Sequence, residues 1–277
     1  MPVSDLEIFQ TETAPEDYIN PEDGLLYCGK CHTPKQKYFE NGLSIGSIKT
    51  HPIPCRCAAE EQERREARQR EALRRDQIRK LRMEAFQDFP AQDWRFEAVK
   101  PNHQLGLAQS FVDHWEEFQT DGMGLLLFGD VGTGKSYAAG CIANALIDRC
   151  HSVRFVGLSD VVNRMQGVYG RERDDYISTL LKPELLILDD LGAERSTSFG
   201  KEQVFDVINK RMLSGKPMIV TTNIPLHVMQ NTGDIQERRI YDRILEVCTP
   251  IQFNGENYRK AGAAENRKKA AALLGQA

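Results

Sequence analysis

The sequence lacks the apolar segments that membrane proteins need. It contains no run of about 18 apolar residues, which is roughly the minimum for a helix that crosses a bilayer. Its first 24 residues include several acids but no lysine or arginine, the opposite of a secretory signal. We therefore predict a cytoplasmic protein that makes no membrane contact.

A general excess of positive charge is also missing. The 277 residues include 36 lysines and arginines against 40 aspartates and glutamates, so the formal net charge is −4. A surface for nucleic acid must then be a local patch. The chain is long enough for one large domain with a smaller appendage.

Cysteine is scarce and unevenly distributed. Four of the seven cysteines form two tight pairs, Cys28-x-x-Cys31 and Cys55-x-Cys57. In a reducing compartment such pairs indicate a metal site rather than disulfides. Four thiolates suit tetrahedral Zn²⁺, and the metal would supply folding free energy that a short, loop-rich segment lacks. We expect a zinc site at these four cysteines.

Other interpretations of the cysteines and histidines remain open. His32 or His51 could replace one thiolate ligand. A redox dithiol is less favoured, because no βαβ pattern surrounds the pairs. The remaining cysteines, Cys141, Cys150 and Cys248, have unrelated spacings and are expected to be buried as small apolar side chains.

Composition divides the chain into four regions. An acidic flexible tail (1–24) precedes the candidate zinc-binding module (25–57), a charged helical linker (58–88) and the remaining domain (89–277). The linker contains no glycine or proline and is dense in Glu and Arg, which favours a helix with charge pairs three and four residues apart. Its Ile78, Leu81 and Ala85 recur at helical spacing and predict one thin docking face. Its arginines could touch phosphates, but the interleaved acids favour a solvated helix.

From Gln92 onward, apolar runs alternate with helical patterns. Strands separated by helices are typical of a parallel sheet covered on both faces. We predict an α/β fold with a five-stranded parallel sheet, one helix over 105–118 and a final short helix within 257–277. The predicted strands are Gly124–Phe128, Val153–Gly157, Leu185–Leu188, Met218–Thr222 and Pro250–Phe253.

The octapeptide GDVGTGKS satisfies the pattern G-x-x-x-x-G-K-[S/T] and lies between an apolar strand and a helical segment. Its glycines let backbone N–H groups surround a phosphate, and the helix N-terminus adds the positive end of its dipole. Lys135 is expected to reach the β- and γ-phosphates, and the Ser136 hydroxyl to ligate Mg²⁺. The predicted nucleotide-binding residues are Gly129, Asp130, Val131, Gly132, Thr133, Gly134, Lys135 and Ser136.

Two neighbouring carboxylates end the apolar run LLILDDLGAE. Asp189 is expected to face the magnesium ion, and Asp190 to orient the attacking water. Asp190 is one methylene shorter than the usual glutamate, which predicts slow hydrolysis. Glu194 is an alternative to Asp190. The run PMIVTTN ends on Asn223, which we expect beside the γ-phosphate as a sensor.

A strand and a helical region separate the Lys135 loop from Asp189, an arrangement of additional-strand ATPases rather than of simple kinases or GTPases. The segments GDVGTGKS, LLILDDLGAE, IVTTN and RRIYDRI, then PIQFNG and ENYR, follow one another across roughly residues 90–260. In order and spacing the chain resembles the AAA+ helicase loaders of bacteria and their phages, the DnaC/DnaI type. Transposition helper ATPases are close relatives.

This resemblance implies a P-loop AAA+ ATPase core behind the zinc module and charged helix. It implies ATP bound between subunits, hence self-association through the ATPase interface. It also implies two partners during initiation of DNA replication, a DnaB-type hexameric helicase and single-stranded DNA. Many loaders carry a similar cysteine module, and in them the N-terminal region engages the helicase.

The resemblance also assigns roles to arginines. Arg243, in YDRI, matches the arginine that one subunit extends to the nucleotide of its neighbour, with Arg238 and Arg239 as alternatives. Arg259 is a candidate second sensor, although we expect no full helical lid. In the family the helical insert after the second strand, here residues 158–181, binds single-stranded DNA. Its candidate contacts, which could equally be the solvated face of an amphipathic helix, are Arg164, Tyr169, Arg171, Arg173 and Tyr176.

Three other functions are open at this point. A transposase-activating helper ATPase would share the core but act on duplex DNA. A nucleotide-gated adaptor would bind ATP with little hydrolysis. A metabolite kinase is disfavoured, because the sensor strand is present and no signal for an acceptor site is found.

Overall fold

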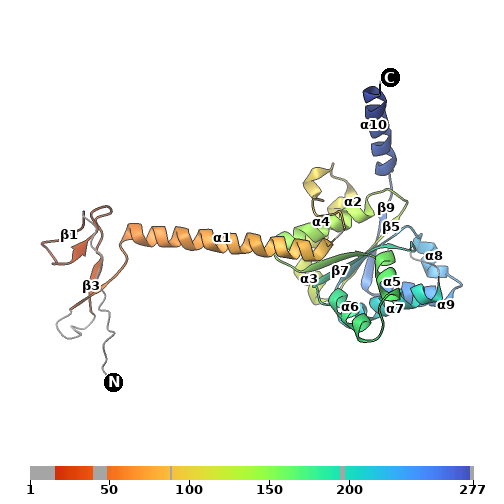
Figure 1. The fold of residues 1–277 in the computed structure, drawn as a ribbon, viewed down its shortest axis with the longest axis horizontal. Helices are drawn as coiled ribbons and strands as arrows, with labels where there is room; N and C mark the ends of the chain where they lie inside the picture. The colour runs from red at the N-terminus through yellow and green to blue at the C-terminus, as the bar shows by residue number, and fades with distance from the viewer. Residues whose placement is uncertain (1–15, 40–48, 88, 194–196, 275–277) are drawn as a thin grey trace. The chain divides into compact units, whose positions relative to one another are not determined.

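The computed structural model describes residues 16–39, 49–87, 89–193 and 197–274, and the chain divides into two compact units, residues 1–75 and 76–277 (Figure 1). Glu194, the alternative to Asp190, lies outside the described residues. Within the described ranges, none of the helices combines the length and the apolar character that crossing a bilayer requires.

The first unit contains two small antiparallel sheets. Strand β1 (Tyr18–Ile19) pairs with β2 (Leu26–Tyr27), and β3 (Gln36–Tyr38) pairs with β4 (Thr50–Pro52). The buried apolar side chains among its described residues are Leu25, Leu26, Cys28 and Cys55. So small a core does not stabilise a domain unaided, which makes a metal or another staple necessary.

Helix α1 (Arg56–Phe86) has the charged composition expected of the linker. Exposed pairs four residues apart, Arg65–Glu61 and Arg75–Glu71, support it at 3.1 and 2.8 Å. Its last turns belong to the second unit, where Ala85 and Phe86 are buried and Ile78 and Leu81 pack against the core. The predicted docking face of this helix is therefore confirmed.

The second unit is built on one parallel sheet in the order β6-β7-β8-β5-β9. The five-stranded parallel sheet of the prediction is confirmed. The strands are β5 (Gly124–Gly129), β6 (Val153–Gly157), β7 (Leu185–Leu191), β8 (Met218–Thr222) and β9 (Cys248–Phe253). Strands β5, β7 and β9 are longer than predicted, because residues at their ends, including Gly129, Asp189 and Cys248, also pair with neighbouring strands.

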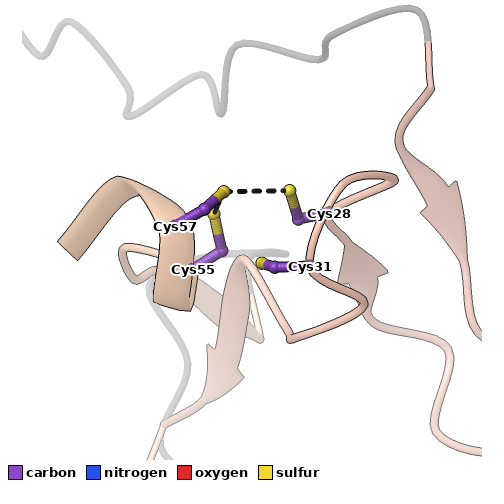
Figure 2. Close-up of side chains that lie close together, drawn as sticks. All are labelled: Cys28, Cys31, Cys55 and Cys57. Carbon is purple, nitrogen blue, oxygen red and sulfur yellow. Dashed lines mark hydrogen bonds between the residues drawn. The ribbon is translucent and has the colours of Figure 1, made fainter. Parts of the chain in front are cut away.

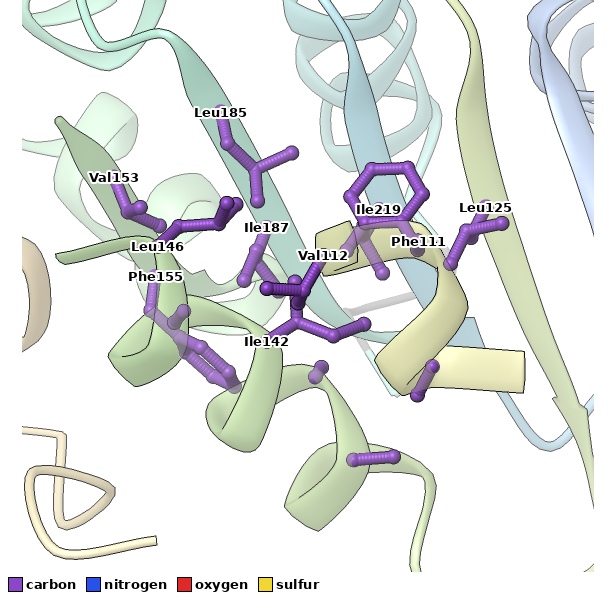
Figure 3. Close-up of a cluster of buried hydrophobic side chains, with 14 of the residues drawn as sticks. Phe111, Val112, Leu125, Ile142, Leu146, Val153, Phe155, Leu185, Ile187 and Ile219 are labelled. Carbon is purple, nitrogen blue, oxygen red and sulfur yellow. The ribbon is translucent and has the colours of Figure 1, made fainter. Parts of the chain in front are cut away.

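Both faces of the sheet are covered, because side chains alternate along each strand. Leu185 and Ile187 of β7 enter one core cluster, which Figure 3 shows, while Leu186 and Leu188 enter the other. The first cluster is covered by α2 (His103–Asp113), α3 (Trp115–Thr120) and α4 (Lys135–Asp148). The second is covered by α5 (Leu158–Gln166), α6 (Arg171–Leu181), α7 (Ser198–Leu213), α8 (Leu226–Asn231) and α9 (Ile235–Val247). A 3₁₀ turn, η2 (Phe96–Ala98), and the terminal helix α10 (Tyr258–Leu273) complete the unit.

Two sequence predictions about this unit are wrong in detail. The helix expected over 105–118 breaks at His114, whose ψ of 30° leaves the helical region, so α2 and α3 are separate. Cys150 is only partly buried, whereas Cys141 and Cys248 are buried as expected. Cys150 follows α4 with a φ of 69°, in a turn that keeps it away from the core.

One buried arginine makes hydrogen bonds to the segments that precede strands β7 and β8. Arg211 of α7 is 0% exposed, and its acceptors among the described residues are all main-chain carbonyls. The acceptors, between 2.7 and 3.1 Å away, are Leu181, Pro183, Glu184 and Pro217. Burial lowers the pKa of Arg211 to about 9, so the side chain stays charged at neutral pH.

We expect Arg211→Met to lower the free energy of unfolding by about 3 kcal/mol or more, because four buried or partly buried carbonyls lose a charged donor. The matched control is Lys210→Met, since Lys210 makes only a half-exposed pair with Asp206 and should contribute within about 0.5 kcal/mol. Urea unfolding followed by circular dichroism measures both. Equal stability of the two variants would contradict the prediction.

Candidate functional site

A cavity of about 610 Å³ opens at the carboxyl ends of β5, β7 and β8. Ligands of open parallel sheets bind at this edge. The cavity brings together residues that lie far apart in the sequence. Its lining includes Val131–Tyr137, Asp189, Asp190, Thr221, Asn223, Phe253, Glu256, Tyr258 and Arg259, together with Trp94, Val99, Lys100, Asn102 and Leu105.

The loop between β5 and α4 has the backbone geometry that a phosphate-binding loop requires. Gly132 and Gly134 have φ values of 83° and 96°, which favour glycine over residues with a Cβ. Gly134 directly precedes α4, so unpaired N–H groups of the helix start face the cavity. The sequence motif thus forms a compact anion-binding turn.

Lys135 connects this loop to β8. Its side chain is 6% exposed, and Nζ donates to the carbonyls of Gly129 and Asp130 at 2.8 and 2.7 Å and to Asn223 Oδ1 at 2.8 Å. Burial lowers the pKa of Lys135, while the nearby Asp190 opposes that shift. The ammonium is therefore held at the phosphate-binding loop.

Asp189 is a buried acid, 7% exposed, at the cavity. Its Oδ1 accepts a hydrogen bond of 2.7 Å from the Thr221 hydroxyl, and Ser136 lines the same cavity. Burial raises the pKa of Asp189, and the Thr221 and Ser136 hydroxyls offset part of that rise. A carboxylate beside a serine hydroxyl offers the oxygen ligands that Mg²⁺ prefers, so these two residues fit a magnesium ion.

Asp190 differs from its neighbour in conformation and exposure. Its φ is 63°, in the left-handed region, and its side chain is exposed. Asn223 Nδ2 donates to Asp190 Oδ1 at 3.1 Å. Since Asn223 Oδ1 accepts from Lys135, one amide joins the lysine to the outer carboxylate. The structure thus brings together Lys135, Asp189, Asp190 and Asn223, as the sequence motifs suggested.

Sequence reasoning missed two residues at the start of α10 that contact the phosphate loop. Asn257 Nδ2 donates to the Val131 carbonyl at 2.7 Å, and Tyr258 N–H donates to the Gly132 carbonyl at 3.0 Å, so the start of α10 is attached to the phosphate loop. Arg259, the candidate second sensor, lines the cavity and acts electrostatically on Lys135 and Asp189. The apolar wall, including Trp94 and Val99, comes from separate segments that no local motif marks.

The candidate arginine fingers lie on α9, outside the cavity. Arg243 is 41% exposed and pairs with Glu246 at 2.9 Å. Arg238 donates to the Thr232 carbonyl, and the guanidinium of Arg239 lies 4.1 Å from the centre of the Phe205 ring. None of the three lines this chain's own nucleotide cavity.

The insert expected as one amphipathic stretch forms two helices, α5 and α6, around Gly167 and Gly170. Tyr169 between them is 80% exposed, whereas burial raises the pKa of the Tyr176 hydroxyl. Arg164 lies 5.9 Å from the Tyr176 ring centre and Arg173 lies 5.7 Å from that of Phe199. Arg171 is exposed.

In the first unit, the two cysteine pairs meet. Figure 2 shows Cys28 and Cys31 from the turn after β2 pointing toward Cys55 and Cys57 at the start of α1. All four Sγ atoms lie within 4.8 Å of one another, with Cys28–Cys57 at 3.6 Å and Cys55–Cys57 at 3.4 Å. Four sulfurs around a tetrahedral zinc lie about 3.8 Å apart. The donor set therefore fits Zn²⁺, and among the described residues neither His32 nor His51 belongs to this group.

Proton sharing among these thiols also fits a cation site. The hydrogen bond with the Thr33 hydroxyl lowers the pKa of Cys31 to about 5. Hydrogen bonds with Cys55 and Cys28 raise the pKa of Cys57 to about 12. A bound cation would displace the remaining protons, which is how thiolate sites couple metal affinity to pH.

Comparison with known proteins supports a nucleotide function for the second unit. A family model described as IstB-like ATP binding protein matches residues 57–266. The replicative helicase loader DnaC of Escherichia coli (strain K12) is 26% identical over 225 residues, which are 80% of this chain and 88% of DnaC. A putative ATP-binding protein in an insertion sequence of Mycobacterium tuberculosis (strain ATCC 25618 / H37Rv) is 28% identical over 141 residues, which are 50% of this chain and 56% of that protein.

The fold has a relative among solved structures. The crystal structure of the DnaC helicase loader matches with a TM-score of 0.53 and 22% identity, over 59% of this chain and 98% of that chain. At this identity the likeness shows the fold alone. Because the family model spans the phosphate loop, both aspartates and Asn223, and covers most of the sequence, the chain belongs to the IstB-like ATP-binding protein family and is an ATPase.

Proposed function

We propose that this protein is an ATP-dependent helicase loader, which binds a DnaB-type replicative helicase and single-stranded DNA in the cytoplasm. One observation carries this proposal. The similarity to DnaC extends over 80% of this chain and 88% of DnaC, whereas the similarity to the insertion-sequence protein covers 50% and 56%. The DnaC match thus involves more of the chain than an ATPase core alone.

In this proposal the chain's own residues prepare ATP for slow hydrolysis. The phosphate loop and Lys135 bind the β- and γ-phosphates, while Ser136 and Asp189 hold Mg²⁺. That ion, when bound, neutralises phosphate charge. Asp190 orients the attacking water. Asn223 fixes the positions of the Asp190 and Lys135 side chains through one hydrogen bond to each.

Arg243 is proposed to act on a neighbouring subunit. It is partly exposed, and its partner Glu246 lies only three residues away on the same helix, so the guanidinium is free to exchange partners. An arginine supplied in trans makes hydrolysis depend on assembly. Arg239 is a weaker candidate, because its guanidinium already stacks on Phe205.

The zinc module is proposed to be folded by Zn²⁺ at Cys28, Cys31, Cys55 and Cys57 and to dock on the helicase. Exposed apolar side chains offer a contact surface on this unit: Ile19 is 67% exposed and Tyr38 is 47% exposed. Such side chains on a small module suit a protein partner. Single-stranded DNA is assigned to α5, α6 and the turn between them, where Tyr169 and Arg171 are exposed and available for stacking and phosphate contact.

A transposase-activating helper is the second candidate. The similarity to an insertion-sequence ATP-binding protein and the IstB-like family model favour it. Such a protein would assemble on duplex DNA and would need no helicase, which separates the two candidates experimentally.

The proposal predicts a stable complex with the replicative helicase of the organism that encodes this chain. Purified protein is mixed with that helicase in Mg·ATP, in Mg·ADP and without nucleotide, and complexes are separated by size exclusion. We expect co-elution with Mg·ATP that Lys135→Ala reduces at least tenfold, by loss of nucleotide binding. No complex in any state, from protein that still binds ATP and assembles on duplex DNA, would favour the transposition helper.

Zinc binding is tested by metal analysis of the full-length protein. We expect about one zinc per chain, and loss of most of it in Cys31→Ser, because three thiolates hold Zn²⁺ far more weakly than four. Cys150→Ser is the matched control, since this partly exposed cysteine lies in the ATPase unit. Full zinc occupancy in Cys31→Ser would rule out the four-cysteine site.

The variant Asn223→Ala tests the hydrogen-bonded link between Lys135 and the Asp190 carboxylate. We expect hydrolysis to fall about 100-fold, the usual effect of losing one preorganised polar group, while ATP affinity changes little because the phosphate loop is intact. Asn231→Ala, in the exposed end of α8, should leave both quantities unchanged. Single-turnover hydrolysis and fluorescent-nucleotide titration give the two readouts; wild-type hydrolysis in Asn223→Ala would exclude this role.

A further inference from the structure

The two adjacent aspartates face one cavity, which an ordinary strand does not allow. Consecutive side chains of a strand point to opposite faces of the sheet. Here both Asp189 and Asp190 line the cavity. The register between β7 and β8 shifts between Leu188 and Leu191, and Asp190 has a φ of 63°. A local bulge with one left-handed residue therefore brings Asp190 to the same cavity as Asp189.

Thr221 of β8 touches both halves of this bulge. It is 1% exposed, its hydroxyl donates to Asp189 Oδ1 at 2.7 Å, and its oxygen accepts the main-chain N–H of Asp190 at 2.9 Å. A hydroxyl has one hydrogen and two lone pairs, so one group can serve both partners at once. The first bond directs the Asp189 carboxylate, and the second holds the peptide that leads into Asp190.

The bond to Asp190 supports an unfavourable conformation. The left-handed region costs free energy for a residue with a Cβ, and such strain persists only where neighbours hold it. Three groups bind Asp190 here: the Thr221 hydroxyl accepts its main-chain N–H, the Ala193 N–H donates to its carbonyl at 3.1 Å, and Asn223 binds its side chain. Without the Thr221 hydroxyl, the main-chain N–H of Asp190 loses its acceptor.

We propose that Thr221 is a positioning residue that assigns the two aspartates their separate roles. Its hydroxyl holds Asp189 beside Ser136 for the metal and fixes the left-handed Asp190 so that its carboxylate reaches Asn223. The inference rests on the metal and water-orienting roles given to these aspartates in the proposed function, and not on the identity of the partner. The sequence patterns assign no role to this threonine, although it lies within the segment IVTTN.

The neighbouring threonine is a matched control. Thr222 lies on the same strand and is 0% exposed. Its hydroxyl donates to the Leu191 carbonyl at 2.7 Å and accepts from the Ile224 N–H at 3.0 Å, so it makes one buried and one partly buried hydrogen bond, neither of them with an aspartate. Any loss that comes merely from removing a buried hydroxyl should appear equally in Thr222→Val.

The test compares Thr221→Val, Thr221→Ser and Thr222→Val in the full chain. Affinity for a fluorescent ATP analogue is measured in EDTA, Mn²⁺ affinity of the ATP complex by electron paramagnetic resonance, and kcat and KM by ATP hydrolysis. For Thr221→Val we expect nucleotide affinity in EDTA within threefold of wild type, Mn²⁺ affinity about tenfold weaker and kcat at least tenfold lower at similar KM. Thr221→Ser should restore all of these, and Thr222→Val should keep them.

Three results would overturn the assignment: wild-type Mn²⁺ affinity and kcat in Thr221→Val, no recovery in Thr221→Ser, or an equal loss in Thr222→Val. Should circular dichroism show that Thr221→Val is unfolded, Thr221→Cys takes its place. Its weaker donor predicts intermediate Mn²⁺ affinity, and wild-type affinity would then overturn the assignment. Failure of helicase binding leaves these readouts unaffected. If the wild-type protein does not hydrolyse ATP, the proposed ATPase mechanism is contradicted. The Mn²⁺ affinities of the variants still decide the role of Thr221 in that case.

Discussion

The position of β8 between β5 and β7 is the constraint on which the second unit depends. Because the strands are parallel, the tips of these three strands meet at one edge. The phosphate loop then faces the aspartates across a gap that β8 fills with Thr221 and Asn223. A sheet with β5 directly beside β7 would leave Lys135 and Asp190 without the amide that joins them. The geometry of the nucleotide cavity thus depends on the order of the strands in the sheet as well as on the phosphate-loop and aspartate motifs.

The first unit follows a different physical principle. Its strands have two or three residues, and few of its described apolar side chains are buried. Hydrophobic burial therefore contributes little, and the four clustered thiols are the feature able to fold it. In the proposed function Zn²⁺ folds this unit, so its other side chains can contact the partner. The proposal thus places partner binding in the first unit and nucleotide binding in the second.

Much of the ATPase unit could be predicted because its signals are local. GDVGTGKS and the apolar runs each lie within one short segment, so periodicity and glycine placement indicated the sheet, the phosphate loop and the acids at its edge. The bulge at Asp190 could not be predicted, because it depends on a hydroxyl 31 residues away in sequence. The attachment of Asn257 to Val131 spans 126 residues. The break at His114 and the exposure of Cys150 likewise depend on turns that helical periodicity does not reveal.

Transfer of the helicase to DNA tests the loader proposal most directly. Closed single-stranded circles coated with single-strand-binding protein are mixed with the organism's replicative helicase and ATP, and helicase bound to the circles is counted after gel filtration. We predict that this protein greatly increases the bound helicase, and that Lys135→Ala does not. Equal helicase on the circles with and without this protein, when the same preparation binds ATP and contains zinc, would contradict a role in helicase loading.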